Sequence, residues 1–114
     1  MSSTQQQPTR SLGRVPVSIQ AEYQYKKTRS SCIITDLGWE GLAVAVRQLF
    51  VEGDSLRVKA TLPNSSISID IWCVVRSIQG CKAELQFDEI SEKQRQEIQG
   101  YIYSLLDTSK LDKK

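Results

Sequence analysis

Two arginines lie four positions apart in the segment TRSLGR, at Arg10 and Arg14. A guanidinium group is a planar fork of N–H donors that matches the oxygens of a phosphate and also the O6 and N7 atoms of a guanine. Two such forks on one short loop could therefore hold a compact dianion from two sides. The alternative is that both arginines are solvated surface charges, which is the more common situation for an isolated pair near a chain end.

A second group of candidate residues lies in the segment DLGWEG, Asp36–Gly41, between two predicted strands. An ionised carboxylate accepts hydrogen bonds at two oxygens, so Asp36 could accept the N1–H and the exocyclic amine of a guanine edge. Gly38 and Gly41 would allow the backbone to approach a ligand closely. The alternative is a hairpin turn or bulge in which Asp36 caps a backbone N–H and the glycines only satisfy the turn geometry.

Two tryptophans and a third arginine could add to such a site. Trp72 and Arg76 lie on the face of a predicted strand opposite its isoleucines, where they could offer a stacking plane and a further cation. The alternative, which we favour, is that Trp72 packs under the C-terminal helix. Trp39 is expected to be half-exposed in its turn, with a role toward a ligand or toward a partner protein.

The composition excludes several other classes of function. The chain of 114 residues contains no histidine, which removes the usual general base and the commonest metal ligand. Its three cysteines, Cys32, Cys73 and Cys81, form no CxxC pair, and no nucleophile–base pair is visible. We therefore expect no enzyme, no metal and no cofactor. The net charge of +2 is too small for a general nucleic-acid-binding protein.

The sequence also indicates the cellular compartment. No apolar run approaches the length of a membrane span, and the first residues lack the apolar core of a signal peptide. The odd number of scattered cysteines is typical of reduced thiols in a cytosolic protein. We expect a soluble cytoplasmic protein.

The hydrophobic pattern predicts a series of strands followed by one helix. Apolar and polar side chains alternate over Val17–Tyr23, and further strand-like segments follow at regular spacing, separated by short turns. The period changes after Ser91, where S-x-x-Q opens a helix with one apolar stripe. That stripe comprises Ile98, Ile102, Leu105 and Leu106, with Tyr101 on its flank. A mainly β fold follows, a small antiparallel barrel or sandwich with a C-terminal α-helix.

Taken together, these features resemble the PilZ domain family, and the match runs from Arg10 to Leu106. That family has an R-x-x-x-R loop before its first strand, here Arg10 to Arg14, and a [D/N]-x-S-x-x-G motif, here Asp36–Gly41. Val74-Val75-Arg76 and Phe87 match later strands of the family pattern. The resemblance implies a six-stranded antiparallel β-barrel with a C-terminal helix. We therefore expect a flexible leader over residues 1–9, the domain over residues 10–106 and a polar tail over residues 107–114.

The resemblance further implies binding of the bacterial second messenger cyclic di-GMP. Carried over residue by residue, Arg10 and Arg14 would clamp phosphates and guanines, Asp36 would accept from a guanine, and Gly41 would allow close approach. The family's serine position is Gly38 here, so one hydroxyl is missing. The accessory ligand-binding residues would be Leu12 and Gly13 in the arginine loop, Trp39 and Arg76.

The expected function is that of a single-domain receptor for cyclic di-GMP. The ligand would change the conformation of the N-terminal arginine loop, and a partner protein of the motility, pilus or exopolysaccharide machinery would read that change in trans. The alternative is a degenerate PilZ-like interaction module that binds no nucleotide and acts through protein contacts. A small barrel that binds single-stranded nucleic acid is disfavoured by the modest charge.

Overall fold

The computed structural model describes residues 14–112, with side chains over residues 14–106. In chain order the elements are β1 (Arg14–Tyr25), β2 (Thr28–Gly38), β3 (Gly41–Ala45), β4 (Ser55–Thr61), β5 (Ser68–Gln79), β6 (Lys82–Glu89) and α2 (Glu92–Asp112). The arginine-loop residues Arg10, Leu12 and Gly13 lie outside the described residues. No helix in the described part of the chain is long and apolar enough to cross a membrane.

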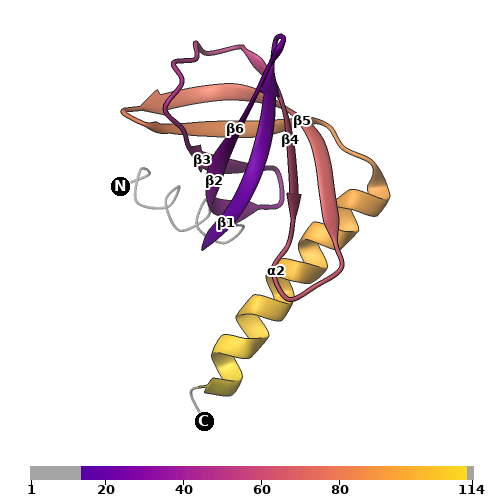
Figure 1. Ribbon diagram of the computed structural model, residues 1–114. Helices are drawn as coiled ribbons and strands as arrows, with labels where there is room; N and C mark the ends of the chain where they lie inside the picture. The colour runs from indigo at the N-terminus through magenta and orange to yellow at the C-terminus, as the bar shows by residue number, and fades with distance from the viewer. Residues whose placement is uncertain (1–13, 113–114) are drawn as a thin grey trace, which may run out of the picture.

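The six strands form a closed antiparallel barrel in the order β1-β2-β3-β6-β5-β4 (Figure 1). The predicted six-stranded barrel with a C-terminal helix is confirmed. The order is not sequential, because β3 pairs with β6 and β4 returns to pair with β1. This arrangement brings the beginning of β1 and the end of β2 close to β6, which comes much later in the chain.

Alternating apolar side chains fill the barrel interior, as the sequence pattern predicts. On β5 the inward residues Ile69, Ile71, Cys73 and Val75 are almost completely buried, and on β6 so are Ala83 and Leu85. The core has no buried polar or charged residue among those described. Burial raises the pKa of Cys32 to about 11 and that of Cys73 to about 12, so both are neutral thiols near pH 7.

The end of β1 far from Arg14 is held by the loop between β3 and β4. Phe50 of that loop packs edge-on against the rings of Tyr23 and Tyr25. Asp54 accepts hydrogen bonds from the backbone N–H of Val51 and from the Tyr25 hydroxyl, at 2.9 and 2.7 Å. Both bonds favour the ionised carboxylate and lower the pKa of Asp54, the Val51 bond most. The loop therefore fixes this end of the barrel.

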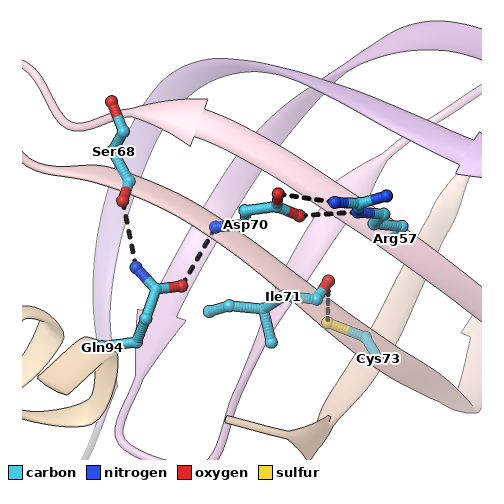
Figure 2. A network of polar contacts seen from close by, with 6 residues as sticks. All are labelled: Arg57, Ser68, Asp70, Ile71, Cys73 and Gln94. Carbon is cyan, nitrogen blue, oxygen red and sulfur yellow. Dashed lines mark hydrogen bonds and ion pairs between the residues drawn. The ribbon is translucent and has the colours of Figure 1, made fainter. Parts of the chain in front are cut away.

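The N-terminus of α2 differs from the predicted capping box. The backbone N–H of Gln94 donates to Ser91 Oγ at 3.1 Å, as expected for the cap. The Gln94 side chain, however, turns to β5, where its amide donates to the carbonyl of Ser68 and accepts from the N–H of Asp70, both at 3.0 Å (Figure 2). Pairing of β5 with β6 begins only at Trp72, so the preceding edge of β5 needs another partner. Gln94 supplies it.

The rest of α2 confirms most of the predicted stripe. Ile98 and Ile102 belong to the core, and the Tyr101 hydroxyl donates to the carbonyl of Pro63 at 3.1 Å. Leu106 was placed in the stripe incorrectly, because 42% of it is exposed. The helix begins beside the start of β5, where Gln94 is bonded, and projects past the barrel (Figure 1), continuing to Asp112 beyond the expected domain end at residue 106.

Replacing Gln94 by alanine removes both bonds to the edge of β5. We expect Gln94→Ala to lower the free energy of unfolding by about 1–2 kcal/mol, the usual contribution of two partly exposed hydrogen bonds. Urea denaturation followed by circular dichroism measures the change. The matched control is Gln96→Ala, the same substitution at an exposed position of the same helix. Equal midpoints for the two variants would contradict the assigned role of Gln94.

Candidate ligand-binding face

Four predicted site residues in the described part of the chain lie close together on three adjacent strands. Arg14 opens β1, Asp36 and Gly38 lie at the end of β2, and Gly41 opens β3. Arg14 is the direct partner of Gly38 in the β1–β2 register, and Asp36 is opposite Ala43 of β3. Arg14, the last residue of the first motif, and the second motif therefore lie on one face, hereafter the ligand face.

Small residues of β3 make the centre of this face. Leu42 and Val44 point into the core, so the alternate residues Gly41, Ala43 and Ala45 lie on the outer side. Ala43 has no exposed surface although it is not part of the core cluster. Side chains from neighbouring strands therefore cover β3 on the outside, and they can do so because β3 presents nothing larger than a methyl group there.

Two ion pairs cross this strip of small residues to β6. Arg14 Nη2 lies 3.0 Å from Glu84 Oε1, and Lys82 Nζ lies 3.2 Å from Asp36 Oδ2. Each pair joins a predicted ligand residue to a β6 residue that the sequence analysis did not select. The side chains remain partly exposed, at 32% for Arg14 and 38% for Glu84, so solvent screens both pairs.

Gly41 is required by the strand packing itself. A Cβ atom at this position would overlap the carbonyl oxygen of Leu85 on β6. The close approach at Gly41 in the structure is between the backbones of neighbouring strands, and the approach of a ligand there stays a prediction. Any approach of a ligand there comes in addition to this constraint.

One of the two tryptophans, Trp72, lies in a different place from the one that we favoured. Trp72 is 43% exposed, so it is not covered by the helix. It is Trp39 that contacts α2, with its ring edge-on to Tyr103 at a centroid distance of 5.9 Å. Trp39 is 36% exposed, as its position in a turn predicted. It links the segment between Gly38 and Gly41 to the C-terminal helix.

Arg76 lies apart from the other candidates. It sits on β5 at an irregularity of the β5–β6 pairing and is exposed. In the barrel order β6 separates it from β3, so it borders the ligand face on the far side of Lys82 and Glu84.

The side chains of the ligand face could hold a ligand through charge and hydrogen bonds. Arg14 and Lys82 offer donors with positive charge, and Asp36 offers two acceptor oxygens for a donor edge. Within residues 14–112 no group of histidine, cysteine, aspartate and glutamate side chains is arranged to hold a metal ion. An anion that also carries N–H donors would satisfy both kinds of group.

The strand pattern alone could have predicted that Lys82 and Glu84 point outward, but not that they lie beside the other candidate residues. The alternation that places Ala83, Leu85 and Phe87 inside also places Lys82, Glu84 and Gln86 outside. That β6 lies beside β3 is a property of the topology and has no local signal in the sequence.

The sequence was compared with models of known protein families. The family model described as PilZ domain matches residues 8–104, most of the chain. The chain belongs to the PilZ domain family. No curated protein matches the sequence.

Solved structures place this PilZ domain among similar folds. The inhibitor of motility MotI/DgrA of Bacillus subtilis is 24% identical, with a TM-score of 0.75 over 83% of this chain and 50% of that one. The PilZ domain of YcgR from Escherichia coli, solved with c-di-GMP, is 11% identical, with a TM-score of 0.73 over 87% and 92%. PlzA of Borreliella burgdorferi, in complex with c-di-GMP, is 16% identical, with a TM-score of 0.61 over 86% and 45%. At these identities the likeness establishes the fold, and the PilZ domain described here spans half the length of the Bacillus protein.

The constraint at Gly41 gives a direct test. We expect Gly41→Ala to lower the free energy of unfolding by about 1–3 kcal/mol or more, because the new methyl group must displace a strand backbone. Thermal and urea denaturation measure this. As a control, Gly100→Ala adds a methyl group in open space within α2 and should raise stability by about 0.5–1 kcal/mol. A Gly41→Ala protein as stable as the wild type would show that β3 and β6 do not pack as described.

Proposed function

We propose that this PilZ domain is a receptor for cyclic di-GMP that signals to a partner protein in trans and catalyses no reaction. The observation that carries the proposal is the meeting of Arg14 and Asp36 on the ligand face, at the ends of β1 and β2. Cyclic di-GMP has two phosphates and two guanines, which are chemically complementary to these two groups. The c-di-GMP found in similar structures of Escherichia coli YcgR and Borreliella burgdorferi PlzA supports the same ligand.

The proposed binding mode divides the ligand between the two motifs. The forks of Arg10 and Arg14 take the phosphates and the O6 and N7 edge of a guanine, with Leu12 and Gly13 as the span between them. Asp36 accepts the N1–H and the exocyclic amine of a guanine. Gly38 and Gly41 keep the surface low enough for the base, and Trp39 and Arg76 border it.

Signal output follows from ordering of the arginine loop. Ligand bound by Arg10 and Arg14 would fix that loop against the barrel, with the free energy supplied by the new charge-assisted bonds. Trp39 lies inside the glycine motif and touches Tyr103, so a change at the motif also reaches α2. A partner protein would read the fixed loop and the neighbouring helix surface.

A second candidate function rests on Trp39 and α2 alone. Trp39, Tyr103 and Leu106 are exposed large apolar residues, and the rings of Trp39 and Tyr103 are in contact. A degenerate PilZ module could bind its protein partner there without nucleotide. The missing serine hydroxyl at Gly38 is the feature that favours this alternative.

Isothermal titration calorimetry with cyclic di-GMP tests the receptor. Loss of charge-assisted bonds should weaken binding about 10- to 150-fold in Arg10→Ala and Arg14→Ala, corresponding to about 1.5–3 kcal/mol. Asp36→Asn should weaken it as well, because an amide presents only one acceptor oxygen. Arg29→Ala, an exposed arginine on the same strand as Asp36, is the matched control. Equal heats for the wild type and the three site variants would refute the assignment, and no heat from the wild type would refute the receptor.

Gly38→Ser separates the two candidate functions. The restored hydroxyl should tighten an existing interaction with cyclic di-GMP by up to about tenfold, the value of one neutral hydrogen bond. Binding that is undetectable in the wild type and present only in Gly38→Ser would instead favour the module that acts without nucleotide. The same calorimetric titration distinguishes these results.

A further inference from the structure

Glu84 forms an ion pair with the guanidinium group of Arg14, the same group that the phosphate of a ligand would have to bind. We propose that Glu84 is an intramolecular competitor at the ligand face and sets the affinity of the site for phosphate-containing ligands. This inference rests on the proposed function for the identity of the ligand. Its physical basis, the ion pair between Arg14 and Glu84, does not.

The geometry places the competitor on the same atoms as the expected ligand. Glu84 Oε1 lies 3.0 Å from Arg14 Nη2, a charge-assisted contact of the kind that a phosphate oxygen would make. Glu84 comes from β6 and Arg14 from β1, with β2 and β3 between them in the barrel. Because Gly38, Gly41 and Ala43 carry no large side chain, the pair closes over the centre of the ligand face.

Charge balance explains why this contact limits binding. In the free protein the four residues Arg14, Glu84, Lys82 and Asp36 form two neutral pairs. A dianion that approaches this face therefore meets no net positive charge from them. It gains Arg14 only after Glu84 turns away, and Glu84 then remains as a nearby negative charge.

The second pair acts in the opposite direction. When Asp36 turns to a guanine edge, Lys82 is released and adds a cation beside the phosphates. Loss of Lys82 would thus have two opposing effects on binding. It would free Asp36 for the guanine, and it would remove a cation that attracts the phosphates. Among these four residues, Glu84 alone opposes the phosphates in both the free and the bound state, so it is the residue to test.

Glu84→Gln keeps the size of the side chain and removes its charge. We expect it to bind cyclic di-GMP about three- to tenfold more tightly than the wild type, because an exposed ion pair no longer has to be broken and a repelling charge is gone. Pyrophosphate, which has phosphates and no guanine, should show the same direction of change. Glu89→Gln is the control, since it removes the same charge from an exposed position of the same strand.

The titrations are carried out by calorimetry or NMR on the full chain with both ligands. Tighter binding of either ligand to Glu84→Gln than to Glu89→Gln supports the competitor. Equal affinities in the two variants, or weaker binding to Glu84→Gln, would overturn it, and weaker binding would mean that Glu84 orients Arg14 for the ligand. If pyrophosphate distinguishes the variants and cyclic di-GMP binds to none, the receptor proposal fails while the competitor stands. Failure of both ligands to bind Glu84→Gln counts against both proposals.

Discussion

The close contact between β3 and β6 is the constraint on which the ligand face depends. Gly41 lies so near the carbonyl of Leu85 that no side chain fits between the two strands at this point. The strand that follows it keeps only alanines on its outer side. Long side chains of β6 can therefore reach over β3 to Asp36 and Arg14, which lie on strands that do not pair with β6. A larger residue on the outside of β3 would separate these charges.

The helix is attached to the barrel at positions that connect it to this face. Gln94 completes the hydrogen bonding of the β5 edge, and Ile98 and Ile102 enter the core, so the first turns of α2 are fixed. Farther along, Tyr103 meets Trp39, which stands between Gly38 and Gly41. An aromatic contact of this kind is worth about 0.5–1.5 kcal/mol, enough to hold the turn in place and small enough to be rearranged.

The sequence predicted those features that depend on local pattern. Alternation identified the inward residues of each strand, and the change of period located the helix, because both are set by backbone geometry within one element. The cross-strand ion pairs could not be predicted, since Glu84 becomes a neighbour of Arg14 only through the order β3-β6 in the barrel. Trp72 and Leu106 were misplaced for a related reason. An apolar side chain indicates a preference for burial, but it does not indicate which other element will cover it. The packing of α2 determines that Trp39 contacts the helix and that Trp72 stays exposed.

The exposure of the two ion pairs matters for a site that exchanges partners. A buried ion pair that loses one member leaves an uncompensated charge at a cost of about 3–5 kcal/mol, whereas an exposed pair is worth about 0–1 kcal/mol. The side chains of Arg14 and Glu84 are both about one-third exposed, so water can solvate each of them when the pair separates. The ligand face thus holds its arginine in place at low cost in free energy. Under the proposed competition, a charge-assisted bond of about 1.5–3 kcal/mol from a ligand to Arg14 would outweigh the pair, and Glu84 would lower the affinity by the smaller free energy of the pair that is broken.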